Sequence, residues 1–441
     1  MIKQFLHKLR YSKGHGGILA RGAIGVFIVK VAGVGLLFAL HVMLARLLGA
    51  EQYGIYVYVW TWVNILAILC LLGFQISLVR FIAEYNIKQQ WGLLRGILRK
   101  SKQFVLGFSI LVSAVGTAVI WFLGDKISNE FVITFYIAFC VLPVFVFARL
   151  REASLRALKH AVQSVLLLQI VRPILMGMGL IAFLLLAENS LTARYAMISN
   201  FTAVIAALLI GTLLLHRFLP ESVGQTSPEF ANKQWLNVSL PLLLIAGMSI
   251  LLRRTDIVML GALKGSEQAG IYSAASKVSN LVVFALVAFN AILTPIVSEL
   301  YYTKQGKKLQ KIITLSARSV FTVTLGISIV LFFSGKFLLN LFGQDFAIAY
   351  TSLFVLLMGN IVCSLAGPVS LLMTMTGYQK LAGKLILFSV IINVILNFFL
   401  IPSMGLLGAA ISTALALSFK NIIMAVYVCK KMKLQPTVLG F

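Results

Sequence analysis

The chain has 441 residues, of which 60% are hydrophobic and only 11% are charged, and its formal net charge is +26. A soluble globular domain has about one-quarter charged residues, so this composition excludes a soluble fold. Apolar runs long enough to cross a bilayer, about 20 residues each, recur along the whole chain. The sequence therefore predicts an all-α membrane protein with many transmembrane helices.

Twelve membrane spans are predicted in chain order, between breaks that are charged or rich in turn residues. The first run is too long for the hydrophobic part of a secretory signal, so it is kept as a span. The predicted spans are 22–46, 53–79, 104–123, 131–148, 161–186, 192–215, 235–260, 269–297, 313–333, 350–372, 380–400 and 405–428.

Basic residues are unevenly distributed over the segments between these spans. With the N-terminus inside, and with 299–318, 377–384 and the residues from Lys420 onward counted as inner, 28 of the 38 Lys and Arg residues fall in or near inner segments and five in or near outer segments. Cytoplasmic loops collect Lys and Arg, so this asymmetry predicts that both termini are cytoplasmic. It explains the basic charge without a nucleic-acid partner and makes membrane lipids the expected contact of the inner segments.

One motif occurs twice, half a chain apart. HVMLARLLGAEQYGIY at 41–56 and IVMLGALKGSEQAGIY at 257–272 agree at ten of sixteen positions. Six spans per half is an even number, so the halves should be parallel repeats that can rock about a central cleft in alternating access. The predicted organisation is an N-terminal six-helix lobe at 1–216, a cytoplasmic linker at 217–234 and a C-terminal six-helix lobe at 235–441.

Charged residues occur inside the predicted spans, where each costs about 2.5 to 3.5 kcal/mol at mid-membrane. Arg253 and Asp256 are spaced i, i+3 and could pair, but most of the positive charge would stay unmatched. The surplus predicts a hydrated cationic cavity that suits an anion, and a diphosphate is a good candidate. The five cations that remain after the inner and outer segments are counted are Lys30, Arg172, Arg253, Arg254 and Lys277, and the one acid is Asp256.

Polar residues at helical spacing accompany these charges. Ser273, Ser276, Lys277 and Asn280 should form one stripe that faces the cleft, and Asn64 is the repeat partner of Asn280. We therefore add Asn64 and Asn280 to the five cations as candidate substrate-binding residues.

Alternative interpretations are open for several of these charges. Arg253, Arg254 and Lys277 are close enough to span ends to snorkel to the interface. Asp256 suits an internal salt bridge better than a proton or sodium ion carrier, although H⁺ or Na⁺ coupling through it is a second interpretation. The cysteines lack metal-ligand spacing and no nucleotide-binding loop occurs, so no metal or other cofactor is expected.

Three stretches carry a family resemblance: ARLLGAEQYGIY at 45–56, RRTDIVMLGALKGSEQAGIYSAASKVSN at 253–280 and TGYQKLAGKLILFSVIINVILNFFLIPSMGLLGAAISTAL at 376–415. They resemble the Wzx-type oligosaccharide-lipid (polysaccharide) flippases of the MOP exporter superfamily. The resemblance implies a V-shaped, two-lobed, MATE-like transporter in a prokaryotic cytoplasmic (inner) membrane. It further implies that cavity cations bind an undecaprenyl-diphosphate-linked oligosaccharide, such as an O-antigen unit, which moves outward. A polysaccharide polymerase and chain-length machinery are the candidate protein partners.

Two other functions were weighed against this one. A MATE-like ion-coupled antiporter of small molecules would have the same fold, but the first span contains Lys30 and no acid. A membrane polysaccharide polymerase or ligase would also be basic and polytopic, but it usually needs a large outer loop, which is missing. The sequence therefore favours a transporter rather than an enzyme.

Overall fold

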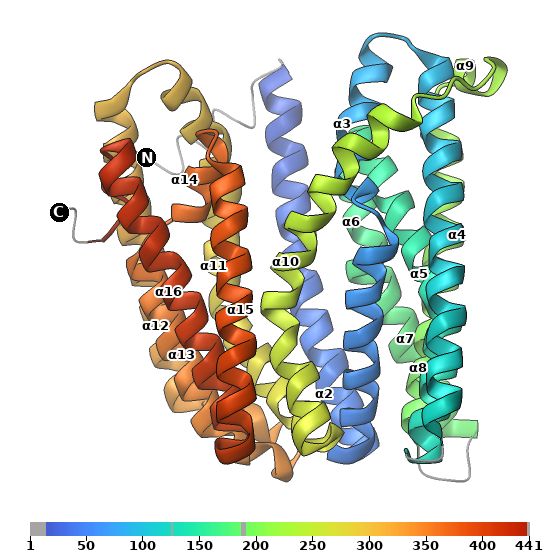
Figure 1. The fold of residues 1–441 in the computed structure, drawn as a ribbon, viewed down its shortest axis with the longest axis vertical. Helices are drawn as coiled ribbons and strands as arrows, with labels where there is room; N and C mark the ends of the chain where they lie inside the picture. Colours follow the sequence, from blue (N-terminus) through green and yellow to red (C-terminus); the bar gives the residue numbers. More distant parts are fainter. Residues whose placement is uncertain (1–14, 125–126, 187–190, 439–441) are drawn as a thin grey trace. The chain divides into compact units, whose positions relative to one another are not determined.

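The part of the chain that the structure describes is all-helical. The computed structural model describes residues 15–124, 127–186 and 191–438, and no strand occurs among them (Figure 1). The first elements are α2 (His15–Cys70), α3 (Phe74–Ile87), α4 (Trp91–Leu123), α5 (Asn129–Ala157), α6 (Ala161–Leu166), the π-helical turn η2 (Leu167–Val171), α7 (Arg172–Leu186), α8 (Ala193–Phe218) and α9 (Glu221–Gln225). The later elements are α10 (Asn232–Lys264), α11 (Ser266–Tyr302), α12 (Gly306–Asn340), the 3₁₀ turn η3 (Gln344–Ala349), α13 (Tyr350–Leu365), α14 (Val369–Met375), α15 (Gln379–Met404) and α16 (Leu406–Met432).

The helices match the predicted spans. Ten helices among the described residues are long and apolar enough to cross a membrane. The first of these, Gly25–Cys70, has 46 residues, about twice the length of one span. Non-helical backbone at Gly49 divides it, with φ 75° and ψ 172°. Each of the twelve predicted spans overlaps a helix, which confirms the all-α membrane fold.

The chain divides into two compact units. Unit 1 contains the described residues up to Leu48 together with Trp62–Gly247, and unit 2 contains Gly49–Thr61 and the described residues from Met248 onward. The short segment after Gly49 thus packs with the second half of the chain. The lobes predicted from the span count have other boundaries, and they stay a prediction.

Unit 1 is built around α5, which packs against α3, α4 and α8, while α8 also packs against α7. The predicted linker is folded onto the start of α4. The Arg95 side chain donates a hydrogen bond of 2.7 Å from Nη1 to the carbonyl of Thr226. The Glu229 N–H donates to the carbonyl of Gly92 at 2.9 Å. This polar segment is therefore a fixed part of unit 1.

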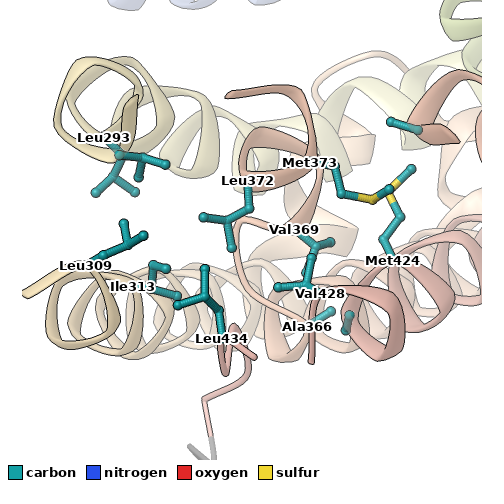
Figure 2. Packing of buried hydrophobic residues seen from close by; sticks show 13 residues of the cluster. Leu293, Leu309, Ile313, Ala366, Val369, Leu372, Met373, Met424, Val428 and Leu434 are labelled. Carbon is teal, nitrogen blue, oxygen red and sulfur yellow. The ribbon is translucent and has the colours of Figure 1, made fainter. Parts of the chain in front are cut away.

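Unit 2 contains a cluster of buried apolar residues from α11, α12, α14 and α16 (Figure 2). The segment that follows α16 closes this cluster, because Leu434 is buried among its members. The segment is also tied to α12: Gln310 Nε2 donates to the carbonyl of Gln435 at 2.8 Å, and the Gln435 N–H donates to Gln310 Oε1 at 2.8 Å. The chain after α16 is therefore held against the helices of unit 2.

The part of the first motif copy that belongs to unit 2, residues 49–56, meets the second copy there. A Cβ atom at Gly270 would lie 2.6 Å from the Cα atom of Gly54, its repeat partner. A Cβ atom at Gly54 would lie 2.2 Å from the carbonyl oxygen of Ser266. Small residues let membrane helices approach closely. The repeated glycine is thus explained by a backbone contact between the two copies.

Candidate functional site

Arg172 lies at a distortion in its membrane helix. The next residue is Pro173, which has no N–H and whose ring clashes with the carbonyl four residues earlier. The helix widens into the π turn η2, and the Arg172 N–H bonds to the carbonyl of Leu167. Such π turns are frequent at functional sites.

The Arg172 side chain is half-buried in unit 1. Its Nε donates a hydrogen bond of 2.9 Å to Oδ1 of Asn200 on α8, and its guanidinium carbon lies 5.6 Å from the centre of the Phe145 ring. Asn200 is fully buried, and its Nδ2 has no hydrogen-bond partner among the described residues. A charged donor is therefore held by an amide whose own donor is unused.

Lys30 lies near this distortion. It is half-buried on α2 in the same unit. One helical turn later, a Cβ atom at Gly33 would lie 2.9 Å from Cβ of Gln169, which belongs to η2. Helix α2, which carries Lys30, is therefore in close contact with η2, which directly precedes Arg172. The contact lies about one helical turn from Lys30 and from Arg172.

Asp256 is the buried charge of unit 2. It lies on α10 with 4% of its surface exposed. Its Oδ2 accepts hydrogen bonds from the Tyr272 hydroxyl at 2.7 Å and from the Thr413 hydroxyl at 3.2 Å. Its Oδ1 accepts from the N–H of Ile257 at 2.9 Å. Neutral groups from α10, α11 and α16 therefore hold this carboxylate.

Two buried amides extend this network along α15. Asn393 Nδ2 donates to the Thr413 hydroxyl at 3.4 Å, and Asn397 Nδ2 donates to Oδ1 of Asn393 at 3.1 Å. Asn393 and Asn397 are both fully buried. The remaining acceptor, Asn397 Oδ1, has no hydrogen-bond partner among the described residues. The network thus combines a carboxylate with an unused acceptor oxygen.

The salt bridge expected for Asp256 is not formed. Four salt bridges occur among the described residues, and none of them includes Asp256. Arg253 is exposed, whereas Asp256 is buried. The prediction of an Arg253–Asp256 pair was wrong because hydroxyl groups on α11 and α16 reach the carboxylate instead.

The other predicted site residues are more dispersed. Arg254 is half-buried on α10. Lys277 is half-buried on α11, where its Nζ donates a hydrogen bond to the Ser273 hydroxyl and lies 5.8 Å from the centre of the Tyr53 ring. Asn280 is exposed in unit 2, and Asn64 is half-buried in unit 1. The predicted polar stripe thus runs from buried Ser273 to exposed Asn280.

The charge-based search missed the uncharged members of both clusters, namely Asn200, Asn393, Asn397 and Thr413. A signal was present, because Asn393 and Asn397 are spaced i, i+4 in a stretch, 390–401, that is otherwise apolar. Two amides on one face of such a helix need polar partners in a membrane.

The fold is that of a known class of transporters. Over 92% of its length the chain is similar to an inward-facing multidrug resistance MATE family transporter of the MOP superfamily, with a TM-score of 0.73, 14% identity and 98% of that chain covered. It is also similar to a MOP superfamily transporter from Pyrococcus furiosus, described as having a binding pocket of reverse polarity. There the TM-score is 0.65 and the identity 13%, over 94% of this chain and 95% of that one.

Family models define the chain more closely. The model for polysaccharide biosynthesis proteins matches residues 19–301, and the MatE model matches residues 241–399. The chain belongs to the polysaccharide biosynthesis protein family. It is 24% identical over 414 residues to the probable low-salt glycan biosynthesis flippase Agl15 of Haloferax volcanii, covering 93% of this chain and 83% of that protein.

Together these findings identify a polysaccharide flippase of the MOP superfamily. The chain is therefore a transporter and not an enzyme, which excludes the polymerase or ligase alternative.

Proposed function

We propose that this protein moves a lipid-diphosphate-linked oligosaccharide from the cytoplasmic to the outer leaflet by alternating access, with undecaprenyl diphosphate as the carrier and an O-antigen or related unit as the glycan. The observation that carries the proposal is the Arg172–Asn200 pair, a half-buried cation inside a membrane helix held by a neutral amide. A guanidinium forms charge-assisted hydrogen bonds to an anionic ligand.

The chemistry of the cations suits a diphosphate. Guanidinium and ammonium groups form charge-assisted hydrogen bonds to phosphate oxygens, and these are about twice as strong as neutral ones. The candidate cations are Lys30, Arg172, Arg253, Arg254 and Lys277, and the candidate neutral contacts are Asn64 and Asn280. The glycan-biosynthesis relative and the family membership support the same class of cargo.

The Asp256 network supports a coupling role in the same transport cycle. Its carboxylate, hydroxyl and amide oxygens are the ligand types that hard cations prefer, and a buried carboxylate can alternatively carry a proton. We propose that a Na⁺ ion or a proton occupies this network during the cycle. The unused acceptor on Asn397 supports the proposal, because a cation would satisfy it.

The setting of the protein follows from the proposed cargo. We propose a prokaryotic cytoplasmic membrane, with both termini on the cytoplasmic side where the lipid-linked unit is made. Polysaccharide polymerase and chain-length machinery would then use the exported unit on the other side.

The proposal is tested by following the lipid-linked glycan in cells. Removal of the protein should leave this glycan in the inner leaflet, and Arg172→Ala or Lys30→Ala should reproduce the block at normal protein levels. Lys336→Ala is the matched control, because Lys336 is exposed. Full export by both variants would contradict the proposed roles of these cations.

A further inference from the structure

The orientation of the Asn200 amide is determined by Arg172. An arginine Nε–H is a donor only, so the amide atom that faces it at 2.9 Å must be the oxygen. The reversed amide would place two donors against each other. The Nδ2 group of Asn200 is therefore fixed on the side away from Arg172 Nε.

This Nδ2 group has no partner although it is buried. Asn200 is fully buried, and no hydrogen-bond acceptor within the described residues is in reach of its Nδ2. Leaving a buried donor unsatisfied costs about 1 to 3 kcal/mol, so each such group needs an explanation. The preceding residue shows the usual outcome, since the buried Ser199 hydroxyl donates to the carbonyl of Met176 at 2.6 Å.

The neighbouring helix is irregular at this point. The π turn η2 ends directly before Arg172, and Pro173 follows, so the backbone around the guanidinium departs from regular α-helix. A Cβ atom at Gly33 would lie 3.1 Å from the Gln169 carbonyl, so α2 packs closely against the same turn. A shift of η2 would change the surroundings of the Arg172 and Asn200 side chains.

We propose that Asn200 is a substrate-binding residue with two tasks. Its Oδ1 orients Arg172, and its Nδ2–H donates to an oxygen of the same anionic group, a phosphate of the lipid-linked substrate, when η2 shifts to admit it. The inference rests on the proposed function, because it assigns a second ligand to the anion that Arg172 binds. It predicts that the donor of the amide matters for anion binding as well as the acceptor.

The test uses the full-length protein in lipid nanodiscs, with inorganic pyrophosphate as the probe. Asn200→Asp keeps an oxygen for Arg172 but replaces the donor with a charged acceptor, so the Kd for pyrophosphate should rise at least about tenfold. Asn200→Ala should raise it by a similar factor because both contacts are lost. Ser199→Ala is the matched control, since Ser199 is equally buried on the same helix, and its Kd should stay within about twofold.

Hydrogen exchange supplies a second measurement that a purely structural role would not move. Pyrophosphate should slow amide exchange at residues 167–172 in the wild type and in Ser199→Ala, and should slow it less in the Asn200 variants at the same pyrophosphate concentration. If Asn200→Ala does not fold, Asn200→Asp is used, because its shape is nearly that of asparagine. Its carboxylate also pairs with Arg172, so the decisive result in this variant is a wild-type Kd, which would overturn the inference.

The outcomes separate this inference from the proposed function. Wild-type affinity in Asn200→Asp, beside a loss in Arg172→Ala, would overturn the role of Asn200 and leave the anion site standing. No pyrophosphate binding by the wild type would overturn both.

Discussion

Each unit holds a charged side chain with neutral hydrogen-bond partners, and the two charges have opposite signs. In unit 1 a cation, Arg172, is held by the oxygen of a buried amide, and the unused atom of that amide is a donor. In unit 2 an anion, Asp256, is held by hydroxyl and backbone donors, and the unused atom of the attached amide network is the acceptor Asn397 Oδ1.

The difference shows what each cluster lacks. An anion could accept a hydrogen bond from the unused donor beside the Arg172 cation. A cation could be bound by the unused acceptor of the network that contains the Asp256 carboxylate. The Asp256 carboxylate is in none of the four salt bridges that occur among the described residues. The comparison therefore suggests an anionic cargo in unit 1 and a coupling cation in unit 2.

The largest effect should come from removing the charge in unit 1. Arg172→Gln keeps a polar, though shorter, side chain but loses a charged hydrogen bond that contributes about 1.5 to 3 kcal/mol, so pyrophosphate affinity should fall roughly 10- to 150-fold. Titration of the purified protein measures this, and Arg99→Gln, an exposed cation, is the control. An equal fall in both variants would show a general loss of surface potential and not a site.

Removing the charge in unit 2 should affect coupling. Asp256→Asn keeps the size of the side chain, but the network loses its negative charge, so stimulation of transport by a Na⁺ or H⁺ gradient should disappear. Proteoliposomes with each gradient applied separately distinguish the two ions. Asp345→Asn, at an exposed acid, should keep the stimulation. If Asp256→Asn also keeps it, Asp256 is a structural residue.

The charges were accessible to sequence reasoning, but their partners were not. Arg172 and Asp256 stand out because a charge is costly in an apolar run. The partner of Asp256 was predicted as Arg253 from spacing along one helix, yet its ligands come from α11 and α16. Contacts between helices depend on packing and rotation, which one sequence does not encode locally.

The fold was more predictable than the site for a physical reason. Span length and hydrophobicity are fixed by the bilayer, so apolar runs locate helices directly. Asn200 carries no charge and is one amide among apolar residues, so its importance becomes visible only when Arg172 is found 2.9 Å away.

Replacing an asparagine by aspartate in each unit tests the comparison further, with a smaller expected effect on ion affinity. Asn397→Asp adds a carboxylate to the network of unit 2, so Na⁺ affinity should rise about tenfold if a cation binds there, since ligand charge tunes cation affinity. The same exchange at Asn200 should weaken anion binding. Sodium titration followed by thermal melting measures the gain. A loss of affinity at Asn397→Asp would contradict the predicted polarity of unit 2.

The smallest effect on ligands should come from the segment after α16. Leu434→Ala removes a buried side chain from the unit 2 cluster and should lower stability by about 2 kcal/mol through the cavity it leaves. Thermal melting should detect this, while pyrophosphate and sodium affinities stay unchanged. Lys431→Ala, at an exposed position on α16, should melt like the wild type. Altered ion binding in Leu434→Ala would mean that the clusters depend on this packing.

The central claim is that a cation inside unit 1 binds the charged part of a lipid-linked glycan during its passage. The most direct measurement is the rate at which a fluorescent lipid-diphosphate oligosaccharide crosses proteoliposome membranes that contain the purified protein. The account predicts rapid crossing for the wild type and for Lys336→Ala, and crossing at least about tenfold slower for Arg172→Gln. Crossing at the wild-type rate by Arg172→Gln would contradict it.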